Sequence, residues 1–109
     1  MSFVELIALD RCRRGGGTFI ERGDRELAVF ILGDPPHPPE AIVIDNTCPH
    51  ANGNLSAGEV NGTIVICPSH NWQFDLCTGV CVDSPRARVR RYPVEIRDGA
   101  VWVELGPAR

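Results

Sequence analysis

Two short motifs, each holding one cysteine and one histidine, constrain this 109-residue chain more than any other feature. The first is Cys48-Pro49-His50, the second is Cys67-Pro68-Ser69-His70, and sixteen residues separate them. Each motif follows an apolar run, residues 42–44 or 64–66, which is typical of a strand that ends in a loop. Strands therefore anchor both loops in our prediction, because a sheet holds the base of a ligand loop rigid.

The rest of the pattern predicts an all-β chain of short strands. Asn61-Gly62 and Asp98-Gly99 lie between β-rich runs and predict two-residue hairpin turns in which both positions take positive φ. The proline-rich segment 33–40 is expected to be a connecting loop. Together these features favour one small antiparallel β-sandwich or barrel over residues 1–109. The expected strands are 3–9, 18–21, 26–32, 41–45, 63–66, 72–76, 88–97 and 100–105.

Composition limits the function classes. The net charge of −3 argues against nucleic acid as a partner, because phosphate-binding domains are usually basic. No apolar run reaches the roughly 20 residues that a membrane span needs, and the first residues lack the basic start of a signal peptide. Five cysteines is an odd number, which does not suit a secreted disulfide framework. We expect a cytoplasmic protein with reduced thiols.

The two motifs point to a metal centre. Two cysteines and two histidines are the ligand set of a [2Fe–2S] cluster with sulfur on one iron and nitrogen on the other. Each motif would then give one ligand to each iron, so the candidate ligands are Cys48, His50, Cys67 and His70. The alternative is a zinc-stabilised interaction module, since zinc accepts the same residues, although structural zinc sites usually pair like ligands.

The stretch 48–94 resembles the Rieske iron–sulfur domain. The matching pieces are Cys48-Pro49-His50, Leu55-Ser56-x-Gly58, Cys67-Pro68-x-His70, Phe74-Asp75, Thr78-Gly79 and Tyr92-Pro93-Val94, with a weaker match towards the N-terminus. The resemblance implies three antiparallel sheets with the cluster at one tip. It also implies that Cys48 and Cys67 hold a buried iron, and that His50 and His70 hold an outer iron.

Departures from the family pattern narrow the subfamily. High-potential quinol-oxidising members carry a disulfide between the two loops, and the matching positions here are Gly53 and Ser69. The chain thus resembles the soluble, low-potential branch. Many soluble members have Gly where this chain has Asn52 and Asn71, and Asn also tolerates the left-handed region. The string His70-Asn71-Trp72 is similar to the small subunit of NADH-dependent nitrite reductase.

The resemblance implies one-electron transfer. In one role the chain is a soluble ferredoxin between an NAD(P)H-dependent reductase and a terminal oxygenase. In the other it is a small subunit beside the large subunit of an assimilatory nitrite reductase. We identify no catalytic residue, and expect a carrier within an oxidoreductase system.

Several other side chains allow two interpretations. Cys77 and Cys81 flank a turn and could form a disulfide or be small apolar residues. Cys12 has arginine neighbours that could lower the pKa of its thiol, or it is incidental. Trp72 could cover the cluster or fill the core. His37 is expected to be a solvated loop residue.

The alternating Arg86, Arg88 and Arg90 predict one face of a strand. That face is either simply solvated or a docking patch for an acidic partner.

Overall fold

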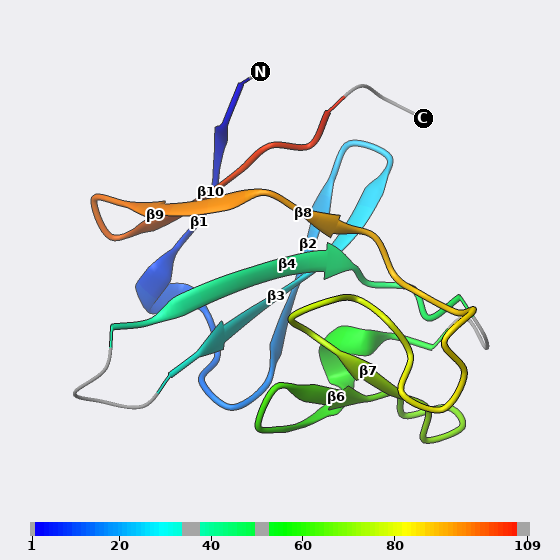
Figure 1. Cartoon of the computed structure of the whole chain (residues 1–109). Helices are drawn as coiled ribbons and strands as arrows, with labels where there is room; N and C mark the ends of the chain where they lie inside the picture. Colours follow the sequence, from blue (N-terminus) through cyan, green and yellow to red (C-terminus); the bar gives the residue numbers. More distant parts are fainter. Residues whose placement is uncertain (1, 34–37, 50–52, 107–109) are drawn as a thin grey trace.

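The strands form three antiparallel sheets (Figure 1). The computed structural model describes residues 2–33, 38–49 and 53–106. The terminal sheet has the order β1 (Val4–Ala8), β10 (Ala100–Val103) and β9 (Val94–Arg97). The central sheet has the order β2 (Gly17–Arg22), β3 (Arg25–Leu32), β4 (Glu40–Asp45) and β8 (Arg91–Tyr92). The ligand-loop sheet has the order β5 (Glu59–Asn61), β6 (Ile64–Ile66) and β7 (Gln73–Asp75).

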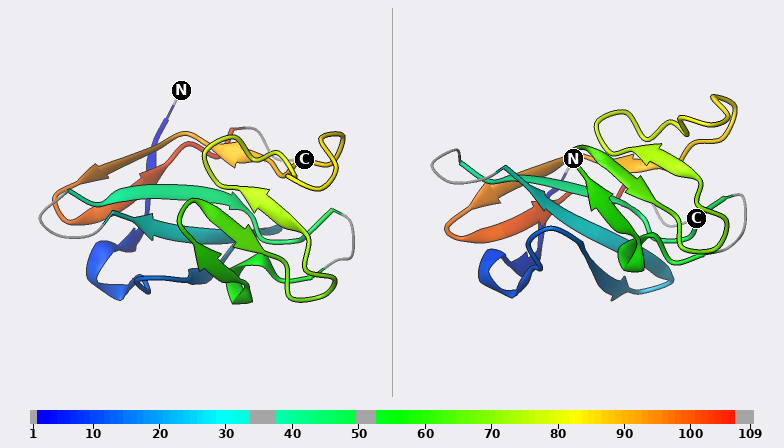
Figure 2. Two further views of the ribbon diagram at one scale, coloured as in Figure 1. Left: turned by 60° about the horizontal axis from the view of Figure 1, so that its bottom comes forward. Right: turned by 90° about the horizontal axis from the view of Figure 1, so that it is seen from below.

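The inner strands of the central sheet, β3 and β4, are buried on both faces. Successive strand side chains point to opposite faces, so the apolar run of β3 serves two cores. Leu27, Val29 and Ile31 pack with the terminal sheet, whereas Ala28 and Phe30 pack with the ligand-loop sheet. Figure 2 shows β3 and β4 between the orange and red terminal strands and the green ligand-loop strands. The predicted all-β antiparallel fold is therefore confirmed, as three layers with two cores.

Within the ranges that the structure describes, two short 3-10 helices complete the fold, η1 (Leu9–Arg11) and η2 (Leu55–Ala57). The first follows β1 and ends the predicted strand early. The second lies between the first ligand loop and β5, and contributes the fully buried Leu55 to the core beside the ligand-loop sheet. In the part of the chain that the structure describes, no helix is long and apolar enough to cross a membrane.

The predicted hairpin turns differ in outcome. Asp98 and Gly99 have φ values of 50° and 75°, so both positions adopt the left-handed conformation that the sequence predicted. The other turn is shifted by one residue: Asn61 pairs with Ile64 inside the ladder, which leaves Gly62 and Thr63 as the turn. Only Gly62 has positive φ there, at 65°. A single positive φ at the first turn position is the pattern of a type II′ turn, which favours glycine at that position.

The predicted strand 88–97 is wrong as a single element. Tyr92 pairs with Val43 of the central sheet, whereas Val94 pairs with Val103 of the terminal sheet. Pro93 lies between them and cannot donate to a ladder, so the chain changes sheets at this residue. The phenol of Tyr92 donates a hydrogen bond of 2.5 Å to Asp45, which ties β8 to the last residue of β4.

Candidate metal centre

The two predicted cysteine ligands lie together in the protein interior. Cys48 follows β4 and Cys67 follows β6, and both side chains are fully buried. They belong to the same apolar cluster, beside Leu55 and Phe74. Figure 1 shows the two loops leaving their sheets at the same end of the molecule. The structure therefore brings together two sulfur donors from loops that are far apart in the sequence.

Hydrogen bonds close the first loop at its base. The Cys48 N–H donates to the Gly53 carbonyl at 2.9 Å, and the Leu55 N–H donates to the Asn46 carbonyl at 2.8 Å. The fully buried side chain of Asn46 adds two contacts. Its Nδ2 donates to Asn54 Oδ1 at 3.0 Å, and its Oδ1 accepts from the Ser56 N–H at 2.9 Å. Asn46 thus joins the end of β4 to η2 across the loop.

Sequence reasoning did not single out Asn46. An asparagine beside a strand end normally indicates a turn on the surface. A buried amide must satisfy its donors and acceptors, and its partners here are eight and ten residues away. The only local signal is that Asn46 directly follows the apolar run of β4 and lies two residues before Cys48.

The second loop is a tight turn. The Cys67 N–H donates to the Trp72 carbonyl at 2.7 Å, and the Asn71 N–H donates to the Cys67 carbonyl at 2.9 Å. Asn71 has a φ of 60°, which confirms that it occupies the left-handed conformation predicted for this position. Asn52, the equivalent residue of the first loop, lies outside the described residues. The half-buried Trp72 packs against the core that holds both cysteines, so it helps to fill that core.

The two loops touch at Gly53. A Cβ atom placed on this glycine would lie 2.5 Å from Ser69 Oγ and 2.8 Å from Cys67 Sγ. Such distances are shorter than van der Waals contact, so only glycine fits this position without a shift. The same hypothetical Cβ would lie 3.2 Å from Ser69 Cβ. Gly53 and Ser69, which the resemblance equates with the inter-loop disulfide positions of high-potential members, are therefore spatial neighbours here, without cysteines.

The predicted nitrogen ligands differ from the sulfur ligands in exposure. His70 is exposed to solvent, while both cysteines are buried. His50 lies outside the described residues, and within the described part no three His, Cys, Asp or Glu side chains gather as a metal site. Two enclosed sulfur donors and an exposed imidazole on the same pair of loops fit a cluster with an inner and an outer iron.

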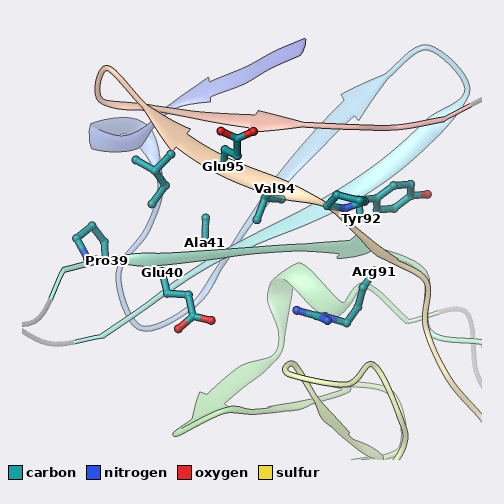
Figure 3. A pocket seen from close by; sticks show the side chains of 9 residues that line it. Pro39, Glu40, Ala41, Arg91, Tyr92, Val94 and Glu95 are labelled. Carbon is teal, nitrogen blue, oxygen red and sulfur yellow. The ribbon is translucent and has the colours of Figure 1, made fainter. Parts of the chain in front are cut away.

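The broad hollow between β4 and β9 does not belong to this site. It has a volume of about 590 Å³ and is lined by the segments 39–41 and 91–96, with no ligand-loop residue (Figure 3). A second hollow, of about 380 Å³, lies beside the first loop. Its lining includes Pro49 of the first motif, the acidic residues Asp24, Glu26 and Asp45, and the basic Arg25.

Among the described residues, no metal-ligand cluster includes Cys12, Cys77 or Cys81. Cys77 is exposed and Cys81 is buried, and both are free thiols rather than partners in a disulfide. The suggestion that arginine neighbours lower the pKa of Cys12 is wrong. Burial raises the pKa of the Cys12 thiol, and this effect outweighs the opposing charge of Arg14. His37 lies outside the described residues.

Comparisons with known proteins agree with this architecture. The family model of the Rieske [2Fe-2S] domain matches residues 2–93. The ferredoxin component of the naphthalene 1,2-dioxygenase system from Pseudomonas putida is 28% identical over 106 residues, covering 96% of this chain and 97% of that protein.

Two solved structures are similar over nearly their whole length. The ferredoxin of Sphingomonas yanoikuyae B1 is 30% identical with a TM-score of 0.82, covering 94% of this chain and 98% of that one. A protein assigned as the small subunit of NADH-dependent nitrite reductase from Mycobacterium tuberculosis is 26% identical with a TM-score of 0.81, covering 94% and 93%. The predicted cofactor, a Rieske-type [2Fe–2S] cluster, is confirmed rather than the zinc alternative, and the chain belongs to the Rieske [2Fe-2S] domain family.

Proposed function

We propose that this protein carries single electrons as the ferredoxin component of an oxygenase-type system. Cys48 and Cys67 would hold the inner iron of the cluster, and His50 and His70 the outer iron. The main support for this proposal is that the two loops touch each other, that their cysteine side chains are buried, and that the imidazole of His70 is exposed. When bound, the cluster supplies a site that accepts and releases one electron.

The residues of the chain set the conditions for this transfer. Leu55, Phe74 and Leu76 surround the cysteines with apolar side chains, which exclude water from the inner side of the site. The loop hydrogen bonds of Cys48 and Cys67 hold the sulfur donors in place, so that little rearrangement accompanies a change of charge. As a ligand, the exposed imidazole of His70 would place one side of the site at the surface, where a docked partner could receive an electron.

Partners follow from the relatives. The similarity to the naphthalene dioxygenase ferredoxin favours an NAD(P)H-dependent reductase as electron donor and a terminal oxygenase as acceptor. We further propose that residues 1–109 form one domain and that it works in the cytoplasm.

A second candidate role is the small subunit of an NADH-dependent nitrite reductase. The similarity to the Mycobacterium tuberculosis structure and the string His70-Asn71-Trp72 favour it. In that role the chain would co-purify in a stable complex with a large sirohaem-containing subunit. As a ferredoxin it would purify alone and pass electrons from a reductase to an oxygenase.

Metal and sulfide analysis of the purified protein tests the proposal. We expect two irons and two acid-labile sulfides per chain, a red-brown colour, and an EPR signal only after reduction. The H70A variant should lose the nitrogen ligand and the normal spectrum, whereas H37A should keep both. A colourless protein with one zinc per chain would refute electron transfer.

A further inference from the structure

An arginine strip lies on the outside of the layer that covers the cysteine pair. Arg86, Arg88 and Arg90, which define the strip, are exposed, whereas the intervening Ala87 and Val89 pack against the core that contains both cysteines. The predicted strand is wrong for this segment, because residues 85–86 form a turn and only Arg88 makes an isolated bridge, with Val80; the three arginines are nevertheless all exposed. Ala87 and Val89 therefore lie between the strip and the core that holds both cysteines.

The strip carries charge that the protein does not neutralise. In the described part of the chain, its three guanidinium groups form no ion pair with a carboxylate, and Arg90 lies over the Tyr92 ring at 5.0 Å. Some arginines elsewhere have partners within the protein. Arg22 donates to the Glu5 carbonyl at 2.9 Å, and Arg97 pairs with Glu95 at 3.1 Å. A local positive surface thus stands on a protein whose net charge is −3.

An exposed apolar side chain lies near the strip. Val82 is 56% exposed, and its N–H donates to the Gln73 carbonyl at 2.7 Å. Gln73 is the first residue of β7 and directly follows the second ligand loop. Val82 therefore lies beside the strand that comes after the proposed ligand His70. Apolar contact surrounded by charge is typical of a transient protein interface.

We propose that the arginine strip, with Val82 beside it, is the docking surface for an acidic face of the electron-transfer partner. The proposal rests on the proposed function and specifies the partner's chemistry. Opposite charges raise the rate of encounter more than they tighten the complex. The segment that carries the strip pairs with Val80 and Cys81, which in turn pair with β7, the strand that follows the second ligand loop. The strip would therefore guide carboxylates of the partner towards that loop, where the electron would leave.

Two cobalt(III) complexes of opposite charge test the sign of the local field. The reduced protein is mixed with anionic tris(oxalato)cobaltate(III) or with cationic hexaamminecobalt(III), and its oxidation is followed by stopped flow. We expect the anion to react faster at low salt than at high salt, although the net charge of the protein is negative. A reaction with the anion that speeds up as salt is added would overturn the proposal.

Paired variants locate the effect. R86Q/R88Q should slow oxidation by the anion by about three- to tenfold at low salt, and R86K/R88K should react like the wild type. The control R11Q/R13Q removes the same charge around η1, which Figure 1 places far from the ligand loops, and should change the rate little. Equal slowing by R86Q/R88Q and R11Q/R13Q would show that net charge alone governs the reaction.

A protein acceptor tests docking itself. R86Q/R88Q should slow electron transfer to the acidic haem protein cytochrome b5 but not to the basic cytochrome c. If R86Q/R88Q changed the rate of electron transfer to both acceptors by the same factor, a docking role for the strip would be refuted. The visible spectrum and iron content of the wild type and of each variant are measured first. A wild-type protein without iron would refute the proposed function rather than the docking role of the strip.

Discussion

At the scale of single residues, Gly53 matters because the ligand loops touch there. A methyl group at this position would collide with Ser69 Oγ and Cys67 Sγ. We expect G53A to push the loops apart, to cost about 1–3 kcal/mol of stability, as overpacking usually does, and to lower the iron content of the purified protein. Iron analysis and chemical unfolding measure both effects. S69A removes an atom at the same contact and should retain iron, and equal iron content in G53A and the wild type would contradict the prediction.

Cys12 provides a prediction at the same scale on pH dependence. Burial raises the pKa of its thiol, so at any pH below that value a smaller fraction is thiolate than in an unfolded peptide. Because thiolate is the reactive form, iodoacetamide should label Cys12 more slowly than it labels an unfolded peptide of the same sequence at pH 8. The C77S variant removes the exposed thiol of Cys77, so that mass spectrometry can follow the labelling rate of Cys12 without that competing site. Labelling of Cys12 as fast as the peptide would show that Arg14 dominates instead.

At the scale of elements, Asn46 links β4 to η2 through its buried amide. N46A leaves the buried N–H of Ser56 without its acceptor, which should cost about 1–3 kcal/mol. Because this link closes the first ligand loop, we also expect faster loss of iron to a chelator. The control N54A removes one of the two side-chain hydrogen bonds, at an exposed residue, and should change both measurements less. Equal effects of N46A and N54A would argue against a special role for the buried amide.

At the scale of the whole molecule, the central sheet separates two cores that should be distinguishable by mutation. Val65 is fully buried in the core with the cysteines, and Val101 is fully buried in the core beneath the terminal sheet. V65A and V101A remove the same atoms, and each should cost about 1.5–3 kcal/mol. Only V65A should also speed iron release to a chelator, measured by the decay of visible absorption. The same release rate in both variants would mean that the cluster depends on overall stability alone.

The sequence predicted local features of the fold better than it predicted which strands pair. The continuous apolar runs and the positive φ of the Asp98-Gly99 turn depend on local sequence, and both were predicted. The switch of sheets at Pro93 was missed although proline was a visible signal, because the residues on both sides are good strand formers. Local pattern does not reveal which distant strand each half will join.

The sequence by itself determined the proposed donor set, since the types and spacing of Cys48, His50, Cys67 and His70 do not depend on the fold. It also determined that Asn71 could take a left-handed turn. Only the tertiary structure decided that Gly53 touches Ser69, that Asn46 closes the first loop, and that Ala87 and Val89 turn the arginines outward. These features depend on contacts between distant segments, and such contacts arise only once the sheets have packed.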